Sequence, residues 1–176
     1  KTGVVIATSG PGATDLVTGI ATAYMDSVPM VAITGNVSTD LIGKDSFQEV
    51  YIAGVTIPIT KHNFMVRRVE DLAPILRRAF QIASSGRKGP VLVDIPKDVT
   101  AAVAEFVPKK PQPAKLCLPE VDLADLVQAA SMINQSQRPV LYFGGGVASS
   151  GAGEELHQLM EKAEIPAVHT LMAAGV

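Results

Sequence analysis

The chain has 176 residues, of which 47% are hydrophobic and 18% charged, a composition that builds a packed core and excludes an intrinsically disordered chain. The formal net charge is -2 and the apolar runs are short, so we expect neither a nucleic-acid nor a membrane partner. Cys117 is the only cysteine, which excludes an intramolecular disulfide and a zinc site built on several thiolates.

A strand, a glycine turn and a helix are expected at the start of the chain. Residues 3–8 form a continuous apolar run that is typical of a buried strand in a parallel sheet. Residues 9–12, Ser-Gly-Pro-Gly, interrupt the run, and a helix of small residues is expected over about 13–25 before a second strand at 29–34. This order is that of a βαβ unit. The glycine turn is either a tight turn of a doubly wound fold or a place where backbone and helix start approach a ligand.

The next segment, residues 35–49, is polar and lacks helical periodicity, so a long loop is predicted. Loops of this length inside a compact domain are usually functional or mobile. Phe47 stands beside Gln48 in this segment and pairs an apolar ring with a hydrogen-bonding amide. The segment is either a solvated loop or part of a ligand pocket.

Short extended pieces are expected at 55–60 and 64–66, followed by a helix over 69–83 whose apolar residues keep a 3.6-residue period. Gly86 follows this helix as a plausible C′ residue. Residues 90–95 predict another buried strand. Lys97 comes directly after it, and is either a cation for a substrate or an ordinary surface lysine.

Prolines then accumulate, and residues 106–120 are expected to be an extended linker between two domains. Beyond the linker Asp122 can cap a helix, and a strand at 139–143, a glycine turn, a helix at about 152–163 and a strand at 165–169 follow. The turn, residues 144–146, does not satisfy the GxGxxG spacing, so it is either a strand-exit turn or a cofactor contact. Three histidines show no metal-ligand spacing: His62, His157 and His169.

Several ordered motifs together resemble one family along nearly the whole chain. They are TSGPGAT at 8–14, DSVPMVAITG at 26–35, IGKDSFQE at 42–49, ITKH at 59–62, GRKGPVLVDIPKD at 86–98 and TLM at 170–172. This combination resembles the large subunits of acetolactate (acetohydroxyacid) synthase, which are thiamine-diphosphate-dependent enzymes.

The resemblance implies an α/β fold with two domains. Residues 1–105 would be the C-terminal part of a three-layer, parallel-sheet domain that binds the pyrimidine ring of thiamine diphosphate. Residues 106–120 would be the proline-rich linker. Residues 121–176 would begin a Rossmann-like central domain associated with FAD.

The resemblance also implies roles for single residues. The thiamine cofactor would contact the glycine turn and an amide of the following loop: Gly10, Pro11, Gly12 and Gln48. FAD would contact one arginine and two segments of the central domain: Arg87, Gly144, Gly145, Gly146, Thr170, Leu171 and Met172. The substrate would contact Phe47 and Lys97.

The implied reaction is the decarboxylation of pyruvate and its condensation with a second 2-keto acid, pyruvate or 2-ketobutyrate, in branched-chain amino-acid biosynthesis. The implied cofactors are thiamine diphosphate, Mg2+ and FAD. The implied assembly is a homo-oligomer with active sites between subunits, with a regulatory small subunit as a possible partner. The expected location is the cytoplasm, or the plastid for a plant protein.

Two elements of the family pattern are missing from this chain. The glutamate that pairs with the pyrimidine ring belongs upstream of Lys1, and neither Glu49 nor Glu70 occupies its motif. The GDG…N motif that binds diphosphate and magnesium belongs downstream of Val176. We therefore expect no catalytic acid or base and no metal ligand here, both ends to be cuts from a longer protein, and the isolated chain to be inactive.

Other functions remain open from the residues alone. The first alternative is a different thiamine-diphosphate enzyme, namely a 2-keto acid decarboxylase, a glyoxylate carboligase or a pyruvate oxidase. The second is a non-enzymatic nucleotide-binding or regulatory module, which the turn at 144–146 favours.

Overall fold

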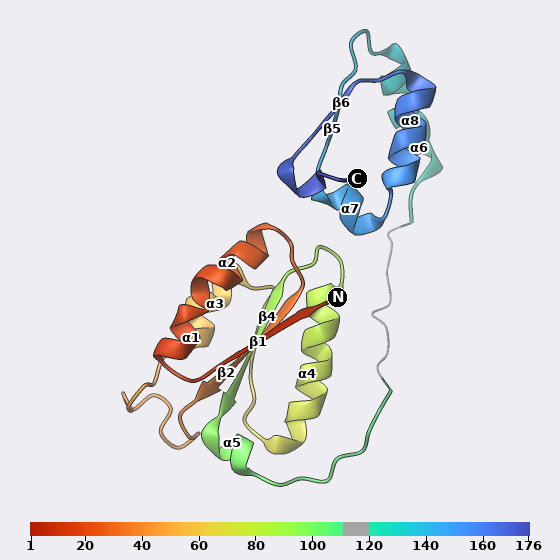
Figure 1. Ribbon diagram of the computed structural model, residues 1–176. Coiled ribbons are helices and arrows are strands. Elements are labelled where there is room, and N and C mark those ends of the chain that lie inside the picture. The colour runs from red at the N-terminus through yellow and green to blue at the C-terminus, as the bar shows by residue number, and fades with distance from the viewer. Residues whose placement is uncertain (111–119) are drawn as a thin grey trace. The chain divides into compact units, whose positions relative to one another are not determined.

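The computed structural model describes residues 1–110 and 120–176. The chain divides into two compact units, Lys1–Cys117 and Leu118–Val176, each of which contains its own sheet (Figure 1). Most of the expected linker, residues 106–120, lies outside the described residues, as does Cys117.

The first unit is built on a parallel sheet of four strands in the order β1-β2-β4-β3. The strands are β1 (Gly3–Ala7), β2 (Met30–Asn36), β3 (His62–Met65) and β4 (Pro90–Pro96). Every residue of β4 is buried, as expected for a central strand covered on both faces. The predicted α/β class with a parallel sheet is therefore confirmed.

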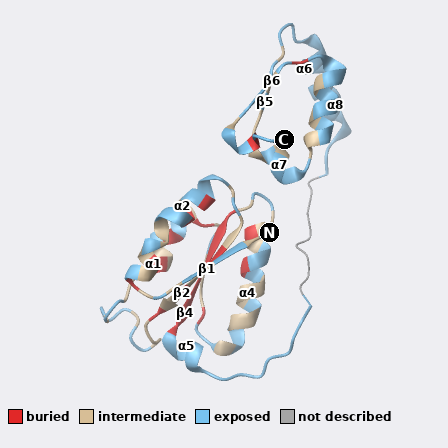
Figure 2. Cartoon of the chain, viewed as in Figure 1, coloured by how far each residue is buried: buried red, intermediate tan, exposed pale blue. Residues whose placement is uncertain are grey.

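Helices cover both faces of this sheet and give the unit three layers. In Figure 1, α1 (Pro11–Asp15), α2 (Val17–Met25) and α3 (Ile52–Thr56) lie on one side, and α4 (Val69–Ser84) lies on the other. Each side has its own apolar cluster, one around Ile20 and Leu92 and the other around Val93, Ala79 and their neighbours. Figure 2 shows the buried residues concentrated on the strands between these layers.

The prediction of an extended piece at 55–60 was wrong. These residues complete α3 and then form a 3-10 helix, Ile57–Ile59, before Thr60 returns to an extended conformation. A short apolar run without clear periodicity does not distinguish strand from helix. The helical form is stabilised locally because the hydroxyls of Thr56 and Thr60 donate to the carbonyls of Ile52 and Thr56, at 2.8 Å in both cases.

The helix expected over 13–25 is divided at Leu16 into α1 and α2. The Leu16 amide donates to the Ala13 carbonyl at 3.3 Å, a bond three residues back that overwinds the chain at this point. The longer helix α4 follows its predicted period and is followed by Gly86, which has a φ of +51° and so takes the left-handed conformation expected at C′.

The second unit contains α6 (Leu123–Gln135), β5 (Leu141–Phe143), α7 (Gly145–Ser150), α8 (Gly153–Ala163) and β6 (Ala167–His169). Its two strands are parallel. Asp122 caps α6 as predicted, because its carboxylate accepts from the Ala124 amide at 2.9 Å. The glycines at 144–146 are more than a turn: Gly144 follows β5 as the N-cap of α7, and Gly145 is the first residue of that helix.

Most of the second unit is exposed, with Ile165 and Ala173 as its buried apolar residues (Figure 2). Among the helices that the structure describes in either unit, none combines the length and apolar character needed to cross a bilayer.

Candidate functional site

Gly10 and Gln48 lie against each other, although they are far apart in sequence. Gly10 has a φ of +59°, and a Cβ added to it would stand 2.7 Å from the Gln48 carbonyl oxygen and 2.8 Å from the Gln48 Cβ. Gln48 itself has a φ of +58°, which is costly for a residue with a side chain. The glycine turn after β1 and the loop after β2 thus meet at one place, and only glycine permits so close an approach.

Gly12 is also closely packed, because a Cβ there would lie 2.7 Å from the Thr8 methyl carbon, which would have to move. Pro11 is exposed as the first residue of α1. Phe47 is 87% exposed and Gln48 is exposed, so both side chains are presented at the surface of the first unit. The predicted contacts of the thiamine cofactor are therefore grouped, and Phe47 stands next to them in the chain.

The Glu49 carboxylate holds the loop that carries Phe47 and Gln48. It accepts from the Gly43 amide and, at 2.9 Å, from the Ser46 amide, and the Glu49 amide donates back to the Ser46 carbonyl at 2.9 Å. These amide donors favour the ionised form and hold the pKa of Glu49 below its ordinary value. The closed loop includes Asp45 at a φ of +53°, a second strained position.

A buried polar cluster lies at the carboxyl ends of β2 and β4. The Asp94 carboxylate is fully buried and accepts from the Thr34 hydroxyl at 2.7 Å and from the Asn36 amide at 2.5 Å. The Asn36 side-chain oxygen in turn accepts from the Val37 amide at 2.8 Å. Burial raises the pKa of Asp94, and the two hydrogen bonds partly oppose this rise. The cluster fixes the point at which the loop leaves β2.

A second carboxylate, Asp98, joins the same loop to α5 (Lys97–Ala101). It accepts from the Thr39 amide at 3.0 Å and from the Thr39 hydroxyl at 2.6 Å, and these bonds hold the pKa of Asp98 below its ordinary value. Lys97 is exposed and precedes Asp98 directly. Lys97, the glycine turn and the loop bearing Gln48 all follow carboxyl ends of parallel strands, the edge at which open α/β sheets bind ligands.

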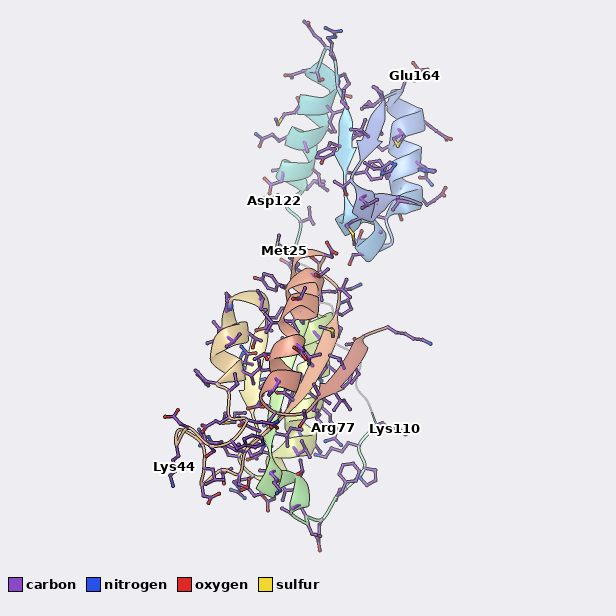
Figure 3. The ribbon with its side chains drawn as sticks, turned by 60° about the vertical axis from the view of Figure 1, so that its left-hand side comes forward. Met25, Lys44, Arg77, Lys110, Asp122 and Glu164 are labelled. Carbon is purple, nitrogen blue, oxygen red and sulfur yellow. The ribbon has the colours of Figure 1, made fainter. Side chains whose placement is uncertain are left out.

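Arg87 belongs to the opposite edge of the sheet. Its guanidinium donates from Nε to the Ser27 hydroxyl at 2.8 Å and from Nη2 to the Met25 carbonyl at 3.5 Å, next to the start of β2. Figure 3 shows Met25 and Lys44, a residue of the loop at the carboxyl edge, at opposite ends of the first unit. The predicted FAD arginine is therefore remote from the residues predicted to contact the thiamine cofactor.

The predicted FAD segments of the second unit lie side by side. A Cβ on Gly144 would stand 3.3 Å from the Thr170 hydroxyl oxygen, and one on Gly145 would stand 3.2 Å from the Met172 Cβ. The Thr170 amide donates to the Phe143 carbonyl at 3.0 Å, which continues the pairing of β5 with β6. A Cβ on Gly146 would meet open space, while Leu171 is 88% exposed. Bare glycine backbone and exposed apolar side chains thus share one patch at the carboxyl ends of the strands.

One open hollow of the first unit, about 450 Å³, lies elsewhere. It is lined by Tyr51, Ile57, Lys61, His62 and Arg67 among others, and by none of the predicted site residues. The Lys61 side chain points to the end of α4, where its ammonium donates to the carbonyls of Ile82 and Ser85 at 2.5 and 2.6 Å. A site formed by backbone loops and completed by other elements need not appear as a hollow in this chain.

Residues 1–110 and 120–176 contain no group of three or more His, Cys, Asp or Glu side chains placed to hold a metal ion.

The sequence interpretation missed the carboxylates that hold the site. Asp94 has a visible signal, since it is a charged residue inside the apolar strand 90–96. Such a residue is buried only with partners, which predicts hydrogen-bonding residues on neighbouring strands. Asp98 and Glu49 have no comparable signal, because charged residues in loops and short helices are usually solvated.

Two family profiles match this chain. The N-terminal TPP binding domain of thiamine pyrophosphate enzymes matches residues 1–55, and the central domain of thiamine pyrophosphate enzymes matches residues 126–176. Together they match more than half of the chain, and each falls within one of the two compact units.

Similar proteins cover the chain from end to end. The acetolactate synthase large subunit of Corynebacterium glutamicum is 52% identical over an alignment of 177 positions, which covers 99% of this chain and 28% of that protein. The acetolactate synthase isozyme 1 large subunit of Escherichia coli is 49% identical over 176 residues, which are 100% of this chain and 31% of that protein. The chain thus spans about three tenths of the length of these curated relatives. Over its whole length the chain is about half identical to segments of acetolactate synthase large subunits, and it belongs to the thiamine pyrophosphate enzyme family.

Proposed function

We propose that this chain is the segment of an acetolactate synthase that supplies one wall of the thiamine diphosphate site and the entrance for the 2-keto acid. The contact between Gly10 and Gln48 carries the proposal. It unites two predicted cofactor contacts at the carboxyl edge of the sheet, where Lys97 also lies. By this proposal residues 1–105 belong to the pyrimidine-binding domain and residues 121–176 begin the central domain.

In this site the chain binds and orients. The backbone of the glycine turn, residues 10–12, lets the cofactor approach closely because no large side chain stands in the way. The Gln48 side-chain amide can form hydrogen bonds with the cofactor. Thiamine diphosphate, when bound, supplies the electron sink for decarboxylation and carbon–carbon bond formation. Phe47 contributes an apolar wall, and the Lys97 ammonium attracts the carboxylate of pyruvate or 2-ketobutyrate.

The remaining parts of the reaction lie outside this chain. The sequence matches neither the family's diphosphate and magnesium motif nor its glutamate motif, so we assign the magnesium ligands and the carboxylate that activates thiamine to other segments of the longer protein. The isolated chain is accordingly expected to be inactive. The site then needs further domains, and we propose a homo-oligomer in the cytoplasm whose subunits share each site. Relatives named large subunits favour a smaller, regulatory partner as well.

We further propose that the patch in the second unit contacts FAD, through Gly144, Gly145, Gly146 and the exposed segment Thr170, Leu171 and Met172. Glycine backbone and exposed apolar side chains suit a flat ligand. Arg87 is the second FAD contact. A guanidinium carries five N–H donors, so its bonds to Ser27 and Met25 orient it and leave donors for a ligand.

The FAD proposal predicts different effects for two exposed arginines. In the full-length enzyme Arg87→Ala should weaken FAD binding about tenfold to a hundredfold, because a charge-assisted hydrogen bond is lost. Arg138→Ala is the matched control, since Arg138 is also exposed but belongs to no predicted FAD segment. Flavin content of the two purified variants, measured by absorbance after denaturation, checks this. Equal flavin in both would refute the role of Arg87.

Product analysis tests the proposed function itself. The full-length enzyme, given pyruvate with thiamine diphosphate, magnesium and FAD, is expected to form acetolactate, and Gln48→Ala should lower the rate. Acetaldehyde as the main product would instead indicate a 2-keto acid decarboxylase, and product that requires glyoxylate or oxygen would indicate the other thiamine enzymes. Binding of ADP or NAD without any turnover would favour a nucleotide-binding module built on the patch at 144–146.

A further inference from the structure

The loop that carries Phe47 and Gln48 is tied to the helix that carries Lys97. The Asp98 carboxylate makes both bonds of this tie, one to the Thr39 amide at 3.0 Å and one to the Thr39 hydroxyl at 2.6 Å. The residues are separated by 59 positions in sequence, so the contact joins two separate strand exits rather than neighbours in one turn.

Hydrogen bonds within the loop link the chain neighbours of Thr39 to those of Gln48. The Leu41 amide donates to the Ser38 carbonyl at 2.9 Å, and the Ser46 hydroxyl donates to the Leu41 carbonyl at 3.1 Å. The Ser46 amide donates to the Glu49 carboxylate, which also holds Gly43. Gln48 lies between Phe47 and this glutamate and rests against Gly10. These hydrogen bonds, together with the chain itself, lead from α5 to the glycine turn.

Two further connections hold the base of the loop: the pairing of β2 with β4, which extends to Asn36 and Pro96, and the buried cluster of Asp94 and Asn36, whose Asn36 side chain accepts from the Val37 amide. Among the described residues, the hydrogen bonds recorded between α5 and the loop from residue 38 onward are the two that Asp98 makes with Thr39. Asp45 and Gln48 both have a positive φ, a strained conformation that persists only where the surroundings enforce it. We therefore expect the loop to change conformation when its bonds to Asp98 are lost.

We propose that Asp98 is a positioning residue that sets the loop bearing Phe47 and Gln48 against Lys97, so that the cofactor contact and the substrate cation keep one spacing. The inference rests on the proposed function of this site. The role assigned to Asp98 is to hold the loop in place, whereas Lys97 and Gln48 are proposed to contact the ligands directly. In this role Asp98 acts through Thr39 and not through a contact of its own with cofactor or substrate.

Variants of the full-length enzyme separate this role from a general effect on folding. Asp98→Ala should raise the KM for pyruvate and the activation constant for thiamine diphosphate by about tenfold to a hundredfold, because both contacts are misplaced. Asp98→Asn, which keeps one acceptor oxygen, should restore part of the loss. Asp40→Asn is the matched control: Asp40 is an exposed carboxylate of the same loop, and its side chain takes part in none of the recorded hydrogen bonds.

A double-mutant cycle and a proteolysis assay complete the test. Thr39→Val should have a smaller effect than Asp98→Ala, and the double variant should be no worse than Asp98→Ala alone. In the apoenzyme, trypsin should cut after Lys44 about tenfold faster in Asp98→Ala than in the Asp40→Asn control, because the loop opens more often. If Asp98→Ala does not fold, Asp98→Asn and Thr39→Val give the same comparison.

The outcomes are distinct. Additive effects in the cycle, or kinetic constants and cleavage rates equal to those of the Asp40→Asn control, would overturn the role of Asp98. A parent enzyme that forms no acetolactate would overturn the proposed function, whatever the variants do. An active parent with an unchanged Asp98→Ala variant would overturn this inference alone.

Discussion

Replacing Gly10 with alanine is expected to lower kcat/KM for pyruvate about a hundredfold in the full-length enzyme, the cost of displacing a contact by roughly 1 Å. The new Cβ would stand 2.7 Å from the Gln48 carbonyl oxygen and 2.8 Å from the Gln48 Cβ, so the loop must move away. Gly10 also has a φ of +59°, which adds strain of about 1–3 kcal/mol for a residue with a side chain. The activation constant for thiamine diphosphate should rise with the loss in kcat/KM.

Gly19→Ala is the control for this experiment. Gly19 lies inside α2, and a Cβ there would meet nothing within 4 Å. Alanine is favoured over glycine in a helix interior by about 1 kcal/mol, so this variant should be as stable as the parent or more stable, with unchanged kinetics. Steady-state kinetics over a range of cofactor concentrations check both variants. If kcat/KM and the activation constant for thiamine diphosphate are unchanged in Gly10→Ala, the contact between Gly10 and Gln48 is not part of the active site.

Replacing Asp94 with alanine is expected to lower the free energy of unfolding of the chain by about 2–5 kcal/mol, because two donors lose their acceptor. Thr34 is 0% exposed and Asn36 is 8% exposed, so water cannot readily replace the acceptor that the Thr34 hydroxyl and the Asn36 amide would lose. Asp94→Asn keeps one acceptor oxygen and should lose less. Asp15→Ala, at an exposed carboxylate, should change the free energy by less than about 0.5 kcal/mol. Urea unfolding followed by circular dichroism measures all of them.

The same residue predicts a dependence of stability on pH. Burial raises the folded-state pKa of Asp94 above its ordinary value of 3.8. The folded state therefore holds this proton more tightly, and the stability that protonation contributes is fully present below the ordinary pKa and is lost as pH rises through the folded pKa. Lowering the pH from neutral toward the ordinary carboxyl range should thus stabilise the chain relative to Asp94→Asn. A difference between the two that does not change with pH would contradict an ionisable Asp94 in the folded state.

The strands could be predicted because they read as apolar runs, but the prediction that residues 3–8 are buried was wrong: β1 is an edge strand, and Val4 and Ile6 are exposed. Residues 90–95 show the apolar run most clearly, and the whole of β4 is buried. The period of α4 is equally plain, because one face of that helix packs on the sheet. Residues 55–60 could not be assigned in this way. Their helical form depends on hydroxyl bonds to the preceding turn, which a short apolar run does not reveal.

The site was accessible from sequence only through resemblance. Spacing alone gave no reason to bring Gly10 next to Gln48, since their contact depends on where two loops leave the sheet. The positive φ of Gln48 and the bonds of Asp98 to Thr39 are likewise tertiary features, because they require partners from other segments. Roles for Arg87 and for the segment 170–172 remain predictions that the binding experiments address.

Segment replacement tests the central proposal most directly. The chain would take the place of the matching segment in the Corynebacterium glutamicum acetolactate synthase large subunit, with which it is 52% identical over an alignment of 177 positions. Acetolactate formed from pyruvate, with thiamine diphosphate, magnesium and FAD, is measured beside the parent enzyme and beside the isolated 176-residue chain. We expect the hybrid enzyme to form acetolactate and the isolated chain to form none. A hybrid that folds and assembles like its parent yet forms no acetolactate, or an isolated chain with turnover of its own, would contradict the proposal.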